Sequence, residues 1–169
     1  MLAVEVNRLG HELADRPLGW RQRGWTRLGH RRGGYRRHMG WDVVHHADLE
    51  WEERPGHEGQ APRHAATLTE PAQMTESRAR MWRYPAHTRG RRHLDPDQEE
   101  VFVPLNGTLT MLLGEPPERV DVEPGGVVIV HPGTPLQMRN ESDEEILVFV
   151  YGAPTRHGNA EFLEDVETL

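Results

Sequence analysis

Beyond residue 40, short runs of apolar residues alternate with clusters of turn-forming residues. The clearest alternation lies within 77–84, where one side consists of Ser77, Ala79 and Met81 and the other of Arg78, Arg80, Trp82 and Tyr84. A period of two is typical of a β-strand, because successive side chains point to opposite faces of a sheet. Similar runs predict further strands at 42–46, 64–69, 100–105, 108–113, 119–122, 127–131, 136–140 and 146–151. This regular spacing favours an antiparallel sandwich or barrel.

The residues between these runs predict the connections. Asn106-Gly107 separates two apolar runs, and Asn-Gly in that position is the strongest short signal for a β-hairpin. The acidic stretch 49–62 contains Gly and Pro and is expected to be a loop. A helix is suggested only at 159–166.

The first forty residues differ from the rest of the chain in charge and composition. Residues 1–40 hold nine Arg against three acidic residues, whereas 41–169 hold eleven Arg against twenty-four, and the whole chain has a net charge of −7. The first segment is rich in Gly, Arg, Trp and His and has no periodicity that could build a core. We therefore expect a poorly structured Arg/Gly-rich extension at 1–40 and one β-domain at 41–169.

Three interpretations of the segment 1–40 are open. The first is a tail without fixed structure, or a stretch that precedes a true start at Met39. The second is an Arg/aromatic segment that contacts nucleic acid, and the third is an organellar targeting peptide. The negative charge of 41–169 disfavours nucleic acid and anionic membranes as partners of the β-domain. Nucleic acid is therefore expected, if at all, only through the extension.

Several classes of protein are excluded by what the sequence lacks. It has no Cys and no Lys, which excludes disulfides, thiolate chemistry and Schiff bases on lysine. It has no phosphate-binding Gly loop, no Gly-x-Ser-x-Gly elbow and no His-Glu-x-x-His. The longest apolar runs, 127–130 and 146–151, are too short to span a bilayer, and the N-terminus lacks a signal-peptide pattern. We expect a cytoplasmic protein.

Two segments carry the residues with candidate chemistry. The first runs from His87 to Gly107 and includes His93, Asp95 and Glu100, and the second runs from Gly125 to Asn140 and includes His131, Pro132, Gly133 and Leu136. Their spacing resembles the two motifs of the cupin superfamily, Gly-x5-His-x-His-x(3,4)-Glu-x6-Gly and Gly-x5-Pro-x-Gly-x2-His-x3-Asn. The resemblance implies an all-β, antiparallel double-stranded β-helix, or jelly-roll barrel. Such barrels are often dimeric and bind their ligand in the barrel mouth.

In cupins, the His and Glu residues of both motifs hold a metal ion, and this chain departs from that pattern. His93 and Glu100 match, but Asp95 stands in place of the second His and Leu136 in place of the last His. The resemblance thus implies a candidate set of His93, Asp95 and Glu100 for a divalent ion such as Fe, Mn, Zn or Ni. Alternatively, Asp95 starts a turn, and His93 and Glu100 pair with each other or with an Arg.

The remaining histidines and scaffold positions give weaker signals. His87 replaces the leading Gly of the first motif, and His131 replaces the turn Pro of the second. His131 is interpreted as an exposed turn residue rather than a displaced ligand. His57 and His64 have no ligand spacing and are expected at the surface.

By resemblance, the pocket is expected to include His93, Glu100, Tyr84, Gln137 and Arg139, although strand alternation sends only half of such residues inward. An inward-facing Arg favours an anionic ligand such as a carboxylate or phosphate. The alternative is an exposed Arg that pairs with Glu144 or Glu145.

The sequence therefore favours a protein that binds a small polar or anionic molecule. One alternative is a metal-dependent cupin enzyme, such as a dioxygenase, isomerase or epimerase, that uses His93, Asp95 and Glu100. Another is a non-enzymatic interaction module. The resemblance also implies a homodimer, with an edge strand at 42–46 or the acidic segment 161–169 as possible contacts.

Overall fold

The structure is a computed structural model that describes residues 40–155 and 159–167, so almost all of the predicted extension 1–40 lies outside the described residues. Within these ranges the chain forms strands and one 3-10 turn, η1 (His46–Asp48). The strands are β1 (Glu52–Arg54), β2 (Arg63–Thr67), β3 (Arg78–Tyr84), β4 (His93–Leu94), β5 (Glu99–Asn106), β6 (Leu109–Leu113), β7 (Glu118–Val122), β8 (Val128–Val130), β9 (Leu136–Arg139), β10 (Ile146–Ala153) and β11 (Glu161–Phe162). No helix in the described part of the chain is long and apolar enough to cross a membrane.

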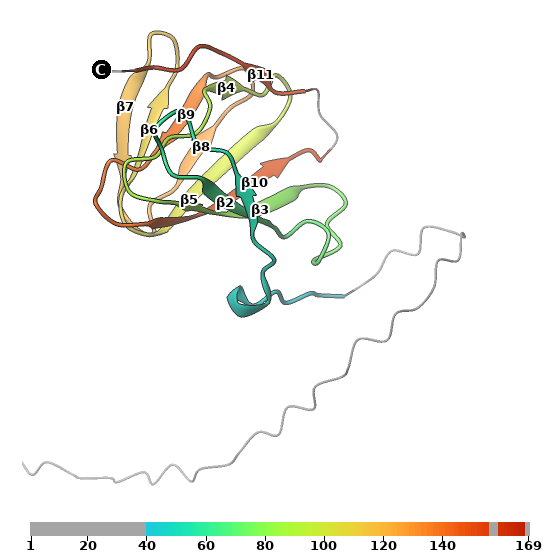
Figure 1. The fold of residues 1–169 in the computed structure, drawn as a ribbon. Coiled ribbons are helices and arrows are strands. Elements are labelled where there is room, and N and C mark those ends of the chain that lie inside the picture. The colour runs from blue at the N-terminus through green and yellow to red at the C-terminus, as the bar shows by residue number, and fades with distance from the viewer. Residues whose placement is uncertain (1–39, 156–158, 168–169) are drawn as a thin grey trace, which may run out of the picture. The chain divides into compact units, whose positions relative to one another are not determined.

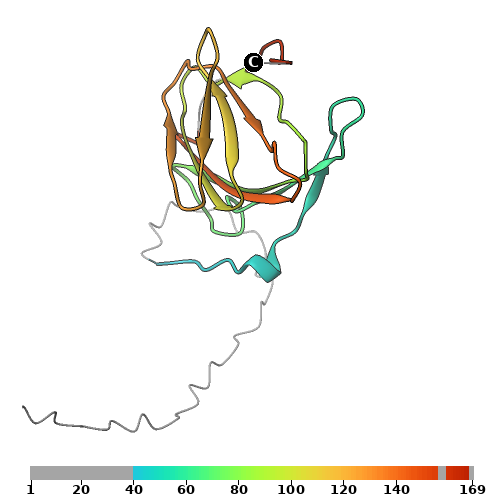
Figure 2. The ribbon, with the colours of Figure 1, turned by 90° about the vertical axis from the view of Figure 1, so that its left-hand side faces the viewer.

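The strands form two antiparallel sheets that face each other (Figures 1 and 2). The larger sheet has the order β1-β2-β3-β10-β5-β8, and the smaller has the order β11-β4-β9-β6-β7. Strands distant in sequence are neighbours, since β10 pairs with both β3 and β5. Buried apolar side chains from both sheets, including Phe102, Met111 and Val148, form one core between them.

Most of the predicted strands are confirmed, and the differences lie in short or loop-like segments. The segment 42–46 forms no strand, and the predicted loop 49–62 contains β1. The predicted helix at 159–166 is wrong, because Glu161–Phe162 pairs with β4 as strand β11. This segment is held by tertiary contacts that local propensity does not reveal.

The predicted hairpin at Asn106-Gly107 is also wrong. Strand β5 pairs with β10 and β8, whereas β6 pairs with β7 and β9, so the chain crosses from one sheet to the other at this turn. Gly107 has φ +62° there, and a Cβ at this position would overlap the side chain of Ile146. The Gly is thus required both by backbone conformation and by close packing.

Candidate functional site

A cavity of about 540 Å³ lies between the two sheets at one end of the barrel. Strands β1, β2, β3, β5 and β10 of the larger sheet supply one wall, and β4, β9 and β11 supply the opposite wall. Its volume is in the range of small-molecule sites. The cavity is therefore the candidate site.

Arginine dominates the polar lining of this cavity. The lining cations are Arg54, Arg63, Arg78, Arg80 and Arg91, and Glu100 is the one acidic residue among the described lining residues. On β3, alternation places Arg78, Arg80, Trp82 and Tyr84 on the cavity side, which is one of the two sides predicted from the sequence. A positively charged cavity thus lies within a domain that is acidic overall.

These arginines divide into two groups by their ion pairs. Arg54 pairs with Glu52, and Arg78 approaches Glu100. Within the described residues, no carboxylate forms an ion pair with Arg63, Arg80 or Arg91. Three guanidinium groups in one cavity therefore have no ion-pair partner among the described residues.

Arg63 is the most buried of these three, with 7% of its surface exposed. Its Nη1 donates to the Tyr84 hydroxyl at 3.3 Å and its Nη2 to the Pro55 carbonyl at 3.2 Å, while its Nε has no partner within the described structure. The guanidinium lies 5.6 Å and 5.4 Å from the ring centroids of Trp82 and Tyr84. Aromatic faces stabilise a cation, but a buried charge without a counter-ion remains costly.

Arg80 lies where positive charge is concentrated. The Arg80 side chain is exposed at the mouth of the cavity, but the partial burial of its guanidinium lowers the pKa of Arg80, and the nearby charges of Arg78 and Arg54 lower it further, whereas Glu70 and Glu52 act in the opposite direction. A lowered pKa means that the charged form of this guanidinium is less favourable in the protein than it would be in water. An anion bound beside Arg80 would remove this cost.

Tyr84, one of the residues expected for the pocket, lines the cavity and is buried. Its hydroxyl accepts the hydrogen bond from Arg63 and donates to Met138 Sδ at 3.7 Å. Burial raises the pKa of Tyr84, although Arg63 opposes the shift, so the phenol stays neutral. A Cβ at Gly90 would lie 2.7 Å from the hydroxyl, so only Gly allows this close approach.

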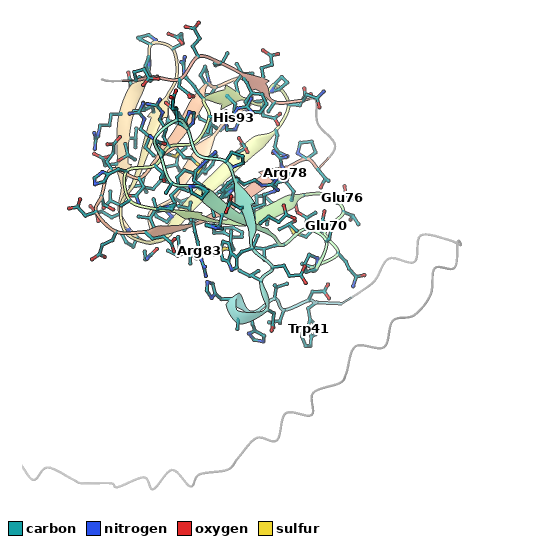
Figure 3. All side chains as sticks on the ribbon, in the orientation of Figure 1. Trp41, Glu70, Glu76, Arg78, Arg83 and His93 are labelled. Carbon is teal, nitrogen blue, oxygen red and sulfur yellow. The ribbon has the colours of Figure 1, made fainter. Side chains whose placement is uncertain are left out.

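His93 on β4 and Glu100 on β5 approach each other from opposite walls of the cavity. His93 Nε2 is 3.8 Å from Glu100 Oε2, and His93 Nδ1 is 3.0 Å from the carbonyl oxygen of Arg91. Because a carbonyl oxygen only accepts hydrogen bonds, Nδ1 carries a proton. Arg78 Nη2 lies 3.6 Å from Glu100 Oε1; Arg78 and His93 are labelled in Figure 3. The structure therefore has the second arrangement considered above, in which His93 and Glu100 pair with each other and with an Arg.

Comparison with known proteins identifies the family. Residues 80–151 match the family model described as a cupin domain. The chain contains a cupin domain. The matched residues span β3 to β10 and include His93 and Glu100. No curated protein sequence matches the chain.

Solved structures share the fold of this cupin domain at low sequence identity. The polyketide cyclase RemF from Streptomyces resistomycificus has a TM-score of 0.61 and 17% identity, over 75% of this chain and 87% of that chain. A predicted oxalate decarboxylase from Thermotoga maritima has a TM-score of 0.58 and 15% identity, over 66% and 98%. A protein with a double-stranded β-helix domain from Klebsiella pneumoniae has a TM-score of 0.50 and 17% identity, over 54% and 74%. The predicted double-stranded β-helix is confirmed.

The ligand set of metal-binding cupins is not assembled here. The Oδ1 of Asp95 accepts hydrogen bonds from the backbone N–H groups of Asp97 at 3.0 Å and Gln98 at 2.8 Å, so this carboxylate organises a turn. Leu136, in place of the last His, is 1% exposed and is the cross-strand partner of His93. In the described part of the chain, no group of three or more His, Asp or Glu side chains is arranged to hold a metal ion. The residues therefore do not fit Fe, Mn, Zn or Ni, and the candidate set of His93, Asp95 and Glu100 is not supported.

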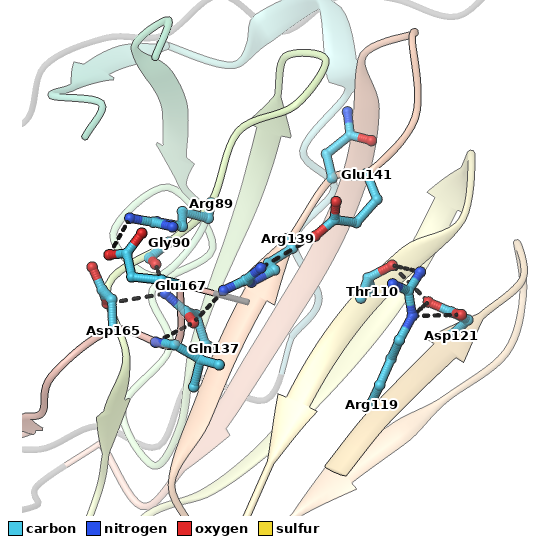
Figure 4. A network of polar contacts seen from close by, with 12 residues as sticks. Arg89, Gly90, Thr110, Arg119, Asp121, Gln137, Arg139, Glu141, Asp165 and Glu167 are labelled. Carbon is cyan, nitrogen blue, oxygen red and sulfur yellow. Dashed lines mark hydrogen bonds and ion pairs between the residues drawn. The ribbon is translucent and has the colours of Figure 1, made fainter. Parts of the chain in front are cut away.

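Gln137 and Arg139, predicted for the pocket, lie on the other side of β9. Met138 lines the cavity, so alternation directs Gln137 and Arg139 away from it. Gln137 is fully buried beneath the C-terminal segment (Figure 4). Its Nε2 donates hydrogen bonds to the Gly90 carbonyl and to Asp165 Oδ1, both at 3.0 Å. Its Oε1 accepts from Arg139 at 3.3 Å. Gln137 therefore holds the C-terminal segment in place, and Arg139 contacts Gln137 from the same strand.

The structure agrees with the prediction for His131 and differs from the prediction for His57. His131 is exposed and pairs with Glu99 at 3.1 Å, as expected for a turn residue. His57 is not a free surface residue, since its Nδ1 lies 3.1 Å from Asp165 Oδ2 and its side chain is mostly buried.

Several lining residues were missed by the motif comparison. Arg54 and Arg63 come from strands before the first motif, and Arg91 lies between the motif positions. Phe162, on β11, lies under the Arg91 guanidinium at 3.4 Å and beside the His93 ring. The sequence has Arg and no Lys, which could have drawn attention to arginine as a binding residue. No pattern in the sequence showed which arginines face the cavity.

Proposed function

We propose that this cupin domain binds a small anionic molecule in its barrel cavity. The observation that supports the proposal most directly is the set of Arg63, Arg80 and Arg91, three lining cations without a carboxylate partner among the described residues. Guanidinium groups bind carboxylates and phosphates through paired hydrogen bonds. The chemical class of the ligand's charged group is therefore a carboxylate or a phosphate.

The apolar part of the lining restricts the rest of the ligand. Trp82, Phe102, Val150 and Phe162 line the same cavity as the arginines. Aromatic and aliphatic walls favour a ligand with a planar or apolar body, since burying that surface stabilises the complex. The proposed ligand therefore combines an anionic group with an apolar portion.

The solved structures allow the same proposal without fixing a reaction. One is called a polyketide cyclase and another a predicted oxalate decarboxylase, so the shared barrel hosts different chemistries. Catalysis is not assigned here, and the homodimer expected from the family stays a prediction, as does the division at residue 40.

A set of matched probes tests the proposal. Isothermal titration calorimetry with 1-naphthyl phosphate and 1-naphthoate is expected to show one site per chain, whereas neutral 1-naphthol binds at least about tenfold more weakly because it lacks the charged hydrogen bonds. Raising the salt concentration is expected to weaken the binding of the two anions and to leave the binding of 1-naphthol unchanged.

The matched variants are Arg80→Gln and Arg83→Gln, both on β3 but on opposite faces. Arg80 lines the cavity, whereas Arg83 stacks on Trp51 and pairs with Glu145. Arg80→Gln is expected to weaken the binding of 1-naphthyl phosphate about tenfold, and Arg83→Gln is expected to leave its binding unchanged. Equal affinity for anionic and neutral probes, or equal effects of the two variants, would contradict the proposal.

A further inference from the structure

Arg78 lies against the residues that match cupin ligand positions. Its Nη2 is 3.6 Å from Glu100 Oε1 and 3.9 Å from Asp95 Oδ2. Both carboxylates are buried, with 7% and 3% of their residues exposed. Burial disfavours the ionised form of a carboxylate unless a positive charge lies nearby. Arg78 supplies a positive charge at the place where these two carboxylates approach each other.

The position of the Arg78 guanidinium is fixed by its surroundings. Its Nε donates to Gln98 Oε1 at 2.7 Å, and Gln98 Nε2 donates to the Pro154 carbonyl at 2.7 Å. Gly152 on β10 is the cross-strand partner of both Arg78 and Glu100, and a Cβ at Gly152 would overlap the Gln98 side chain. The missing side chain at Gly152 thus leaves the space in which Gln98 orients Arg78.

The opposite side of the site is apolar. Leu136 replaces the last His, lies across from His93 and belongs to the hydrophobic core. A metal ion held by His93 and Glu100 would gain no ligand from this side and would have to lie beside the guanidinium of Arg78. Like charges at such distances repel strongly where little water screens them.

We propose that Arg78 takes the place of the metal ion of metal-binding cupins as the positive charge beside Glu100. The His93–Glu100 pair then forms part of a cavity that keeps its structure without a metal. Because the Arg78 charge is shared with Glu100 and Asp95, the ligand's anionic group is left to Arg63, Arg80 and Arg91. The role of Arg78 is independent of whether an anionic ligand binds, since its contacts are within the protein.

Cobalt binding by tag-free protein tests this inference. Co²⁺ is titrated into wild type, Arg78→Met and Arg78→Lys, with its visible absorption and the melting temperature as readouts. Wild type and Arg78→Lys are expected to show no Co²⁺ site that depends on His93. Arg78→Met is expected to melt at a lower temperature, because it removes a positive charge from beside two buried carboxylates, and to regain part of the loss when Co²⁺ is added.

A second substitution shows which residues bind the Co²⁺ in Arg78→Met. In the Arg78→Met background, Glu100→Gln or His93→Ala is expected to abolish the Co²⁺ effect, which separates this site from exposed histidines. A wild-type protein that binds one Co²⁺ per chain and loses it on His93→Ala would overturn the inference, and this measurement remains decisive if Arg78→Met does not fold. A folded Arg78→Met that melts like wild type, or gains no cobalt site, would also overturn it.

Discussion

Replacing Asp165 by Ala is expected to release the C-terminal segment from the barrel. The Asp165 carboxylate accepts hydrogen bonds from Arg92 N at 2.7 Å and Gln137 Nε2 at 3.0 Å, and pairs with His57 at 3.1 Å. One side chain therefore ties the segment 159–167 to three separate parts of the domain. The same segment contributes Phe162 to the cavity wall.

The size of the effect follows from these contacts. Hydrogen bonds to a charged group contribute about 1.5 kcal/mol or more each, so losing two of them weakens the closed segment by about 3 kcal/mol, or about a hundredfold in its opening equilibrium. The remaining anchors are the two-residue pairing of β11 with β4, the Leu163 N–H to the Arg92 carbonyl at 3.0 Å, the Val166 N–H to Gln137 Oε1 at 3.3 Å, and an ion pair of the exposed Glu167 with Arg89 at 2.8 Å. Since ordering each residue costs about 1–2 kcal/mol, these anchors do not hold the segment closed alone.

Amide hydrogen exchange measures this opening directly. In Asp165→Ala, the amides of Leu163 and Val166 are expected to exchange about a hundredfold faster, while amides of β5 and β10 keep their protection because the segment opens locally. Glu164→Ala removes an exposed acid from the same segment and is the control, with no expected change. Unchanged exchange at Leu163 and Val166 in Asp165→Ala, or equal acceleration in both variants, would refute the assignment of Asp165 as the anchor.

Two further outcomes follow from the cavity wall. Gly152→Ala is expected to lower stability by about 2 kcal/mol or more, measured by urea unfolding, because its Cβ displaces the buried Gln98 amide and breaks its bond to Arg78; a change below about 0.5 kcal/mol would contradict this packing. Burial raises the pKa of Tyr84, so the folded state holds the phenol proton more tightly; this contribution is complete below about pH 10 and is lost as the pH rises through the raised pKa. The loss of stability at alkaline pH, measured by denaturant midpoints, is therefore expected to be smaller in Tyr84→Phe than in wild type, and identical pH profiles would contradict it.

The fold could be predicted because most strands carry their own signal. Strand β3 shows a clean alternation, and the turn residues bound the long strands β5 and β10. Strands β1, β4 and β11 have only two or three residues, and their form depends on pairing with a neighbour. Such strands have no pattern long enough to detect in the sequence.

The site was harder to predict, because orientation depends on what covers each face. On β9, Leu136, Gln137 and Met138 are all buried, since the core covers one face and the C-terminal segment the other. Burial on both faces removes the polar and apolar alternation that would have assigned Gln137 to the outside. His93 and Glu100, which the motif comparison singled out, line the cavity from opposite walls, but the motifs carried no information on Arg63, which another strand brings to the cavity.

The exclusive use of arginine in the cavity has a consequence for how binding responds to acidity. Guanidinium groups ordinarily lose their proton only above about pH 12, and Arg80, whose pKa is lowered by its surroundings, is the first lining arginine expected to lose charge as the solution becomes strongly alkaline. Any pH dependence of capture at acidic and neutral pH then reports the ionisation of the incoming molecule or of a lining residue other than arginine, and a phosphate monoester and a carboxylate become distinguishable by the acidity at which each ceases to bind.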